Sequence, residues 1–584
     1  MNQDTEFKNE FRVKGSEKLL SIIRSFSATE KVVFGFFTII FILSSLTLTY
    51  KAGKIFMVEI PSHGGEFTEG IIGLPRSINP VLAFTDVDKD LSTLVYSGLV
   101  KYENNDLIPD IASKYDISND GLIYSFTLKD NVKFHDGVEL TTDDIEFTIQ
   151  KIQDSAIKSP KKTDWAGVTI KKINDKEIQF ILKQPYAPFL SNLTLGITPK
   201  HIWKNLDADQ FVFSEYNLEP IGSGPYKVEE IIKNKSGIPT KYTFSSFKKF
   251  YNGEPYISNV NINFYSNEKL AIEAYTSGEI ENFAGISPKE ISPIASSSKN
   301  INILHTPLPR IFGIFFNQNN SQILANKEVR QALNLVIDRD EIINKVLYGY
   351  GASISGPLPR EMTEDARHSE NSDEDIAKEI LTKAGWQINK DGILEKKSTK
   401  KTGGSAQVLE LSISTSDAED LKQIAEMVKV KWENLGAKVN VKVFEFGDLS
   451  QNIIKTRKYD ALLYGEAIGK NIDLYAFWHS SQKNYPGLNV AMYVNSKVDK
   501  ILEEARSNSN ENERNNLYES FNQIIQEDIP AIFIYSPEYI YLMSNKINGN
   551  TLKNITSASD RFYGIDKWYI TTDYVWKIFK NKIN

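Results

Sequence analysis

A run of 19 residues without a charge, Val32–Tyr50, constrains this chain more than any other feature of its sequence. At a helical rise of about 1.5 Å per residue, the run just crosses a hydrocarbon layer of about 30 Å. Six basic residues precede it: Lys8, Arg12, Lys14, Lys18, Arg24 and Lys31. The positive-inside rule therefore places the N-terminus in the cytoplasm. The pattern predicts a single transmembrane helix at 32–50, with a cytoplasmic segment at 1–31 and most of the chain outside the cytoplasmic membrane.

Two alternatives to this anchor are a cleaved signal peptide and a buried core helix. The apolar run is long for the hydrophobic region of a signal peptide, and the segment before it is long for a basic leader. No A-x-A cleavage pattern follows the run. These features favour an uncleaved signal-anchor, followed by a short tether at 51–65.

The bulk composition excludes several classes of protein. With 584 residues the chain is too long for one hydrophobic core, and 41% hydrophobic with 24% charged residues is typical of a globular protein. The net charge is −7 and no block of Lys and Arg occurs, so we expect no nucleic-acid partner. The absence of cysteine excludes disulfides, thiolate metal sites, a cysteine nucleophile and a lipid attached to cysteine.

The local patterns indicate alternating strands and helices. Tyr124, Phe126 and Leu128 alternate with polar residues, which predicts a half-buried strand. Thr141 with Asp144 resembles a capping box that opens a helix. Further helices and strands alternate between residues 328 and 526, so the sequence predicts an α/β lobe.

Several blocks resemble family 5 of the bacterial extracellular solute-binding proteins, which includes the oligopeptide, dipeptide and nickel receptors of ABC transporters. The blocks follow one another in the family's order over roughly residues 66–560. They are the N-P and Tyr-x-Gly-Leu segment (Leu74–Gly121), the strand-turn-helix segment with F-H-D-G (Ile123–Ile149), PIGSGPYKV (Pro220–Val228), the V-R-x-A block (Val329–Pro359) and the C-terminal blocks (Tyr459–Pro537).

The resemblance implies an α/β fold of the type II periplasmic-binding-protein class, a two-lobed clam-shell with three domains. Domain I would comprise 66–88, 215–312 and 535–584, domain II 89–214, and domain III 313–534. Two crossing strands, near Arg310–Asn317 and Ile532–Pro537, would form the hinge, and the lobes would close around a ligand.

The function implied by the resemblance is that of an extracytoplasmic receptor, not an enzyme. It would capture oligopeptides, deliver them to ABC permease subunits and act as a monomer held at the membrane by the N-terminal helix. A non-peptide solute such as a nickel chelate, opine, sugar or haem is an alternative. A surface sensor or an enzyme that reuses the fold is another.

The segment Tyr464–Trp478 is the predicted ligand-binding region, facing the cleft between the lobes. By resemblance, the backbone of Gly465, Glu466 and Ala467 would pair with a peptide as an added strand. The aspartate that grips the peptide's α-ammonium in relatives has no clean match, since that position falls near Gly469 or Lys470. Glu466 or Asp473 is expected to substitute for it, with a structural role as the alternative for each.

Other predicted ligand contacts lie on both sides of this segment. Tyr475, Phe477 and Trp478 are expected to form a wall of the binding cavity, with core packing as the alternative. Arg310 is a candidate partner for a ligand carboxylate. Weaker candidates come from domain I: Asn79, Phe84 and Phe283.

The sequence offers no catalytic or metal-binding motif. The six histidines include no pair at i, i+4 and no H-E-x-x-H, so we expect no metal and no cofactor. His135 lies in a turn and is predicted to be structural, whereas His479 follows Trp478 in the candidate ligand segment. Gly222-Ser223-Gly224 lacks the context of a phosphate loop or a nucleophile elbow, and predicts a tight turn that packs two domains together. Within that turn, Gly224 is expected to need either a positive φ or a close backbone approach.

Overall fold

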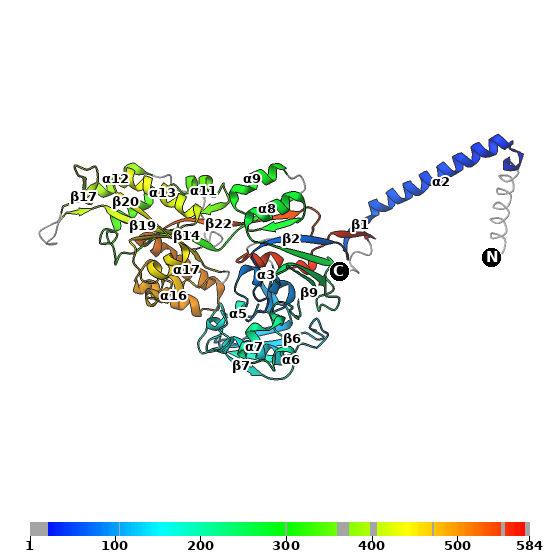
Figure 1. The fold of residues 1–584 in the computed structure, drawn as a ribbon, viewed down its shortest axis with the longest axis horizontal. Coiled ribbons are helices and arrows are strands. Elements are labelled where there is room, and N and C mark those ends of the chain that lie inside the picture. Colours follow the sequence, from blue (N-terminus) through cyan, green and yellow to red (C-terminus); the bar gives the residue numbers. More distant parts are fainter. Residues whose placement is uncertain are drawn as a thin grey trace, which may run out of the picture. The chain divides into compact units, whose positions relative to one another are not determined.

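The computed structural model describes residues 22–103, 106–297, 301–358, 373–397, 406–469, 472–550 and 555–577. Its contacts divide the chain into two units. The smaller unit comprises Met1–His63 and Thr571–Asn584, and the larger one comprises Gly64–Ile570. Figure 1 shows the ribbon with its helices and strands labelled. The hydrophobic cores and all candidate site residues belong to the larger unit.

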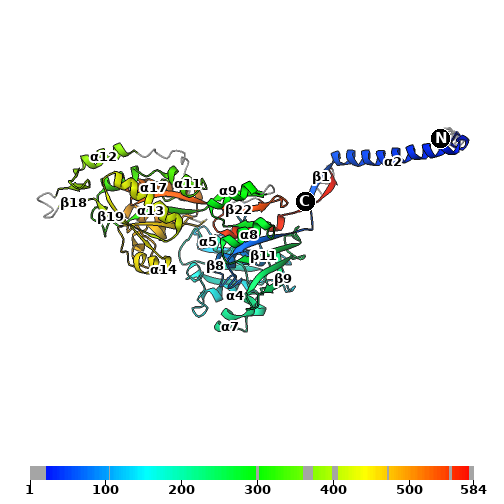
Figure 2. The ribbon, with the colours of Figure 1, turned by 45° about the horizontal axis from the view of Figure 1, so that its top comes forward.

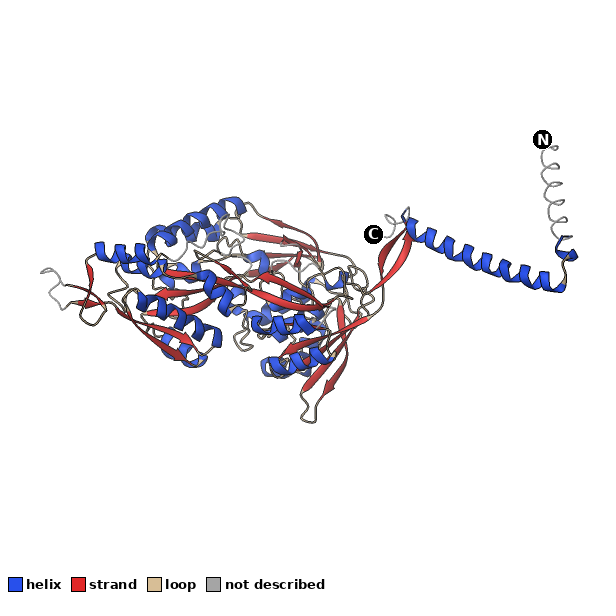
Figure 3. Ribbon diagram, turned by 90° about the horizontal axis from the view of Figure 1, so that it is seen from above, coloured by secondary structure: helices blue, strands red, loops and turns tan. Residues whose placement is uncertain are grey.

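The smaller unit consists of a long helix and a two-stranded antiparallel ladder. Helix α2 (Ala28–Phe56) leads directly into strand β1 (Met57–Ser62), which pairs with the C-terminal strand β23 (Thr571–Trp576) (Figure 3). Within α2, Ala28–Thr49 is long and apolar enough to cross a membrane, with a mean hydropathy of 2.2 and no buried residue. The segment predicted as a tether therefore continues as helix to Phe56 and then forms a paired strand.

One large sheet organises the larger unit. Its order is β20-β19-β21-β14-β22-β12-β2-β11-β10-β9, and β13 and β15 also pair with β22. The N-terminal half of β22 pairs with β14 and β15, and its C-terminal half pairs with β12 and β13. The two segments predicted to connect the lobes are thus strands β14 and β22, which pair with each other. The strands are β2 (Glu66–Ile72), β9 (Tyr226–Lys233), β10 (Pro239–Ser246), β11 (Asn259–Tyr265), β12 (Asn282–Ala284), β13 (Ile301–Pro307), β14 (Arg310–Phe316), β15 (Gly351–Ser353), β19 (Glu410–Ser416), β20 (Lys438–Phe444), β21 (Ala461–Ala467) and β22 (Ala531–Ser544).

Helices cover the β20-to-β14 end of this sheet and form two hydrophobic cores with it (Figure 2). One core lies around Trp432 and Leu463, and the other around Trp478 and Leu462. The elements are α10 (Lys327–Leu335), α11 (Arg339–Val346), α12 (Glu374–Lys383), α13 (Glu419–Asn434), α14 (Phe446–Asp448), the π-helical η4 (Leu449–Ile454), α15 (Tyr475–Trp478), η5 (Ser480–Gln482), α16 (Ser496–Ser507), α17 (Glu511–Asp528) and the small sheet β16 (Trp386–Ile388), β17 (Leu394–Lys396) and β18 (Gln407–Val408).

At the other end, five helical elements pack on strands β2 and β9–β13 of the sheet. Residues of α8 and α9 share a core with Ile540 and Leu542 of β22. A second core, around Tyr541 and Phe67, includes residues of α3, η6 and η7. The helical elements are α3 (Asp86–Val95), α8 (Glu268–Ser277), α9 (Pro288–Ser297), η6 (Ala558–Phe562) and η7 (Ile565–Lys567).

A separate antiparallel sheet, ordered β5-β6-β8-β7, has its own core around Trp165 and Trp203. Tyr124, Phe126 and Leu128 are buried along β6 as predicted, and the Thr141–Asp144 capping box opens α4. The elements are β3 (Val100–Glu103), β4 (Asp106–Pro109), β5 (Ala112–Ile117), β6 (Ile123–Leu128), β7 (Thr169–Lys172), β8 (Glu177–Ile181), α4 (Thr142–Gln153), η1 (Lys162–Trp165), α5 (Phe189–Asn192), α6 (Lys200–Trp203), α7 (Ala208–Phe213) and η2 (Glu215–Asn217).

The turn at Gly222–Gly224 is pressed against the end of α3. A side chain at Gly224 would place its Cβ 2.5 Å from the backbone carbon of Val95, although Gly224 has no positive φ. The Gly224 N–H donates to the Val95 carbonyl at 2.7 Å. The prediction of a close backbone approach is confirmed.

His135 binds the same turn through both ring nitrogens. Its Nε2 lies 3.1 Å from the Gly224 carbonyl, and its Nδ1 accepts the Gly222 N–H at 3.2 Å. This pattern requires a neutral ring protonated on Nε2. Burial lowers the pKa of His135 to about 4. His135, in the F-H-D-G segment that follows β6, therefore connects the β5-β6-β8-β7 sheet and the Gly222–Gly224 turn through hydrogen bonds.

We expect Gly224→Val to destabilise the protein by ~1–3 kcal/mol, because the added atoms would overlap the Val95 backbone. Denaturant unfolding measures the loss. Ser223→Ala is the matched control, since the Ser223 Oγ is buried with no hydrogen-bond partner among the described residues. Equal stability of the parent and Gly224→Val would contradict the close approach.

Stability should also depend on pH through His135. The pKa of this residue is lower in the folded state, about 4, than the ordinary value of 6.5, so the unfolded chain binds more protons between these values. The stabilisation is complete above pH 6.5 and is lost as pH falls towards 4, by up to about 3 kcal/mol. The free energy of unfolding, measured between pH 4 and 6.5, should depend less on pH in His135→Gln than in the parent or in Ser223→Ala. Parallel pH profiles would rule out this contribution.

Candidate functional site

Strand β21 has an open edge in its C-terminal half. On one side, β14 pairs with it along its whole length, from Phe316↔Ala461 to Arg310↔Ala467. On the other side, β19 pairs only with Ala461 and Leu462. Tyr464–Ala467 has no strand partner on that side among the described residues. An extended chain could add to the sheet there through backbone hydrogen bonds.

Side chains alternate along β21 and give its residues different surroundings. Gly465 faces the ring of Phe312, and a Cβ at Gly465 would lie 2.6 Å from that ring. Phe312 itself stacks on Tyr535 of β22, with ring centroids 4.8 Å apart. Gly465 is thus required by close packing of an aromatic pair that joins strands β14 and β22.

Glu466 lies on the opposite face of β21, the face of Leu462, which belongs to the core around Trp478. Its exposed fraction is 4%, and its Oε1 is buried without a hydrogen-bond partner among the described residues. Burial raises the pKa of Glu466 well above its ordinary value. Burial thus disfavours the charged form of this carboxyl, which argues against the prediction that it presents a negative charge to a ligand.

Asp473 already has partners within the protein. Arg506 of α16 forms an ion pair with it (Nε–Oδ2, 3.1 Å), and the Tyr186 hydroxyl donates to the same oxygen at 3.3 Å. The Arg506 guanidinium lies over the rings of Tyr186 (5.1 Å) and Tyr475 (4.6 Å). The Ala187 N–H donates to the Arg506 carbonyl at 3.0 Å. This cluster joins the end of the β8 region to α15 and α16.

The predicted aromatic wall is divided between core and surface. Trp478 is 1% exposed and packs against Phe315, Phe521 and Phe533. Tyr475 is half-buried and stacks on His479 at 4.1 Å. Core packing, the alternative considered for these aromatics, describes Trp478, whereas Tyr475 belongs to the Asp473–Arg506 cluster.

Arg310 is half-buried and directly opposite Ala467 in the β14–β21 pairing. No acidic partner contacts its guanidinium among the described residues. Arg310 thus places a basic group on the paired side of β21, across that strand from its open edge. Lys470, the other basic candidate in this segment, lies outside the described residues.

The domain I candidates do not join this group. Phe283 is fully buried in the core of α8 and α9, and Phe84 is 71% exposed. Asn79 is buried and its Oδ1 accepts the Val81 N–H at 2.9 Å. Its neighbours Pro80 and Ala83 line a separate polar cavity of about 300 Å³, bounded by α3, η1, α5 and η6, which contains no residue of β21.

Comparisons with known proteins agree with this architecture. Residues 106–487 match the model of Bacterial extracellular solute-binding proteins, family 5 Middle. The chain belongs to this family. It is 29% identical to the oligopeptide-binding protein AppA of Bacillus subtilis, over 87% of this chain and 92% of AppA.

Two solved structures of relatives show the same fold. The structure of B. subtilis AppA in complex with a nonapeptide has 27% identity and a TM-score of 0.66, covering 88% of this chain and 100% of AppA. NikZ of Campylobacter jejuni, in complex with Ni(L-His), has 25% identity and a TM-score of 0.67, covering 86% and 99%. The predicted type II periplasmic-binding-protein class is confirmed, and family 5 members are binding proteins of transporters.

Ser481, His479 and Glu503 form a row of polar side chains next to Trp478 and resemble the serine, histidine and acid of a hydrolase. Ser481 Oγ lies 2.8 Å from His479 Nδ1, and Glu503 lies 3.3 Å from His479 Nε2. The same Nδ1 also accepts the Ser481 N–H at 3.1 Å, so His479 caps η5. A ring nitrogen already bonded to an amide is a poor general base, so this arrangement is structural in this family 5 member.

Sequence reasoning missed Arg506 and Tyr186. They lie 33 residues after and 287 residues before Asp473. Tyr186 lies outside the quoted blocks, and nothing in the sequence distinguishes Arg506 within Tyr459–Pro537. The position of Glu466 could have been found, because strand alternation places it on the face of Leu462 and Tyr464.

Proposed function

We propose that this chain is a membrane-anchored extracytoplasmic receptor of an ABC importer that captures oligopeptides between two closing lobes. The observation that carries the proposal is the open edge of β21 at Tyr464–Ala467. An edge of this kind binds a peptide backbone regardless of its side chains. The relative AppA, whose structure holds a nonapeptide, supports the same ligand class.

The charges around β21 refine the ligand chemistry. Burial raises the pKa of Glu466 and disfavours its charged form, and Asp473 is paired with Arg506, so the described residues of this segment offer no free carboxylate for an ammonium group. Arg310, without an acidic partner among the described residues, is available to a ligand carboxylate. These observations favour recognition of the peptide's carboxylate end. They also keep an anionic or neutral non-peptide solute as the second candidate.

Binding of alanine-based peptides with free and blocked termini tests this assignment by calorimetry. We expect Arg310→Met, or amidation of the peptide's C-terminus, to cost about 2–5 kcal/mol of binding free energy. N-terminal acetylation and Glu466→Gln should change the affinity little. Loss of binding on acetylation, with no effect of amidation, would instead show that an acidic group holds the ammonium end.

The anchor has support of a different kind. Helix α2 contains an apolar segment of 22 residues, Ala28–Thr49, with no part buried in protein. We therefore propose that 32–50 spans the cytoplasmic membrane uncleaved, with residue 51 onward outside.

Mass spectrometry of the mature protein in the membrane fraction tests the anchor. We expect peptides from residues 1–31 to be found in the mature protein, because no A-x-A cleavage pattern follows the apolar run. A mature N-terminus beginning after residue 44 would show that the segment is a signal peptide.

A further inference from the structure

Trp576 differs from every other tryptophan in the chain. The other six are at most 1% exposed, namely Trp165, Trp203, Trp386, Trp432, Trp478 and Trp568, whereas Trp576 is 46% exposed. Tryptophan is highly buried on average in soluble proteins, and an exposed one beside other apolar groups marks an interaction surface. The exposure of Trp576 thus calls for a partner.

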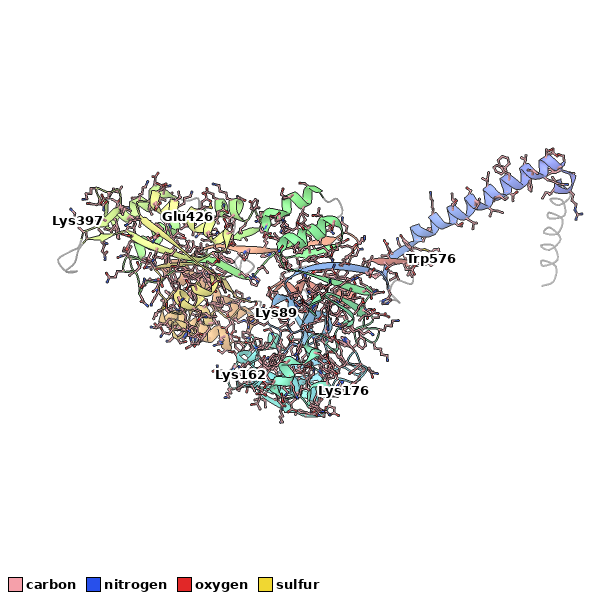
Figure 4. The ribbon with its side chains drawn as sticks, in the orientation of Figure 1. Lys89, Lys162, Lys176, Lys397, Glu426 and Trp576 are labelled. Atoms are coloured by element: carbon pink, nitrogen blue, oxygen red, sulfur yellow. The ribbon has the colours of Figure 1, made fainter. Side chains whose placement is uncertain are left out.

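The surroundings of Trp576 are aromatic and basic. It lies on β23 opposite Met57, the residue that follows Phe56 at the end of α2 (Figure 4). Tyr574, two residues earlier on the same strand face, is 44% exposed, and Phe56 is 60% exposed. Lys577 follows Trp576 directly. We call Phe56, Tyr574 and Trp576 the aromatic rung.

The length of α2 fixes the height of the aromatic rung relative to a bilayer. The helix has 29 residues, which corresponds to about 44 Å at 1.5 Å per residue. A bilayer including its headgroup layers is about 40–45 Å thick. With Ala28 at the inner surface, the end of α2 reaches the outer headgroup layer, and the Met57–Trp576 pair of the ladder begins there.

We propose that strand β23 returns the C-terminal region to the membrane, where the aromatic rung binds the lipid headgroup layer around the exit of α2. The inference rests on the proposed membrane anchor. Tryptophan and tyrosine favour this layer because their rings are apolar and their N–H and O–H groups are polar. Lys577 adds attraction to lipid phosphates. The region after α2 is then a paired, membrane-bound ladder and not a free linker.

Tryptophan fluorescence of the full chain in vesicles tests the proposal. The vesicles contain phosphatidylcholine brominated near the headgroup end of its acyl chains, and bromine quenches only nearby indoles. We expect quenching in the parent and none in Trp576→Phe, because the remaining six tryptophans are buried in the larger unit. Unchanged emission of those six verifies that the variant is folded.

Two added tryptophans in the Trp576→Phe background separate the possible failures. Leu43→Trp, near the middle of α2, reports insertion of the helix in vesicles whose phosphatidylcholine is brominated near the methyl end of its acyl chains. Thr571→Trp lies at the far end of the ladder, about 17 Å from residue 576. Quenching of Leu43→Trp and of Trp576, but not of Thr571→Trp, supports the proposal. Quenching of Leu43→Trp without quenching of Trp576 would overturn the binding of the aromatic rung to headgroups and would leave the proposed membrane anchor intact. No quenching at either position overturns the anchor as well.

A protein partner on the aromatic rung would give a different result. If a second copy of the chain covered it, Trp576 would be protected from acrylamide but not quenched by brominated lipid. That protection would fall when the protein is diluted in the membrane. This outcome would also overturn the lipid assignment.

Discussion

The guanidinium of Arg561 holds together the half of the large sheet on which the rest of the larger unit is built. It donates to Glu69 of β2 at 2.7 Å and to Asp90 of α3 at 2.8 Å, and all three side chains are at most 4% exposed. Tyr541 of β22 donates to the same Glu69 at 2.8 Å. Removing one partner of such a buried group leaves an uncompensated charge, at a typical cost of 3–5 kcal/mol. Two carboxylates share one guanidinium, and burial raises the pKa of Asp90 to about 6.

Tyr541 belongs to β22, a long strand whose N-terminal half carries Tyr535. There Tyr535 stacks on Phe312 of β14, and Phe312 in turn leaves room only for glycine at position 465 of β21. A buried ion cluster, an aromatic stack and a glycine thus follow one another across β22, β14 and β21. The strand that bears the open edge is thus packed through Phe312 and Tyr535 onto β22, the strand that also contacts the Arg561 cluster.

Local patterns in the sequence were sufficient for the elements that depend on neighbouring residues. The Thr141–Asp144 cap, the alternation in β6 and the close approach at Gly224 were predicted because sterics and backbone hydrogen bonds act over a few residues. The pairing of β1 with β23 was not predicted, since its partners are more than 500 residues apart. The Arg506–Asp473–Tyr186 cluster was missed for the same reason: isolated polar residues carry no periodic pattern that would reveal a contact in space.

Under the proposed function, the pairing of Asp473 with Arg506 bears on which end of a peptide would be recognised. A ligand ammonium that binds Asp473 Oδ2 would compete with the Arg506 guanidinium, which also lies over the rings of Tyr186 and Tyr475. Displacement would leave a half-buried guanidinium unpaired, so the exchange of one cation for another gains little. A ligand carboxylate at Arg310 requires no such exchange. The charge pattern of this chain therefore favours the proposed capture through backbone pairing and an anionic end, whereas Asp473 joins Arg506 of α16 to Tyr186.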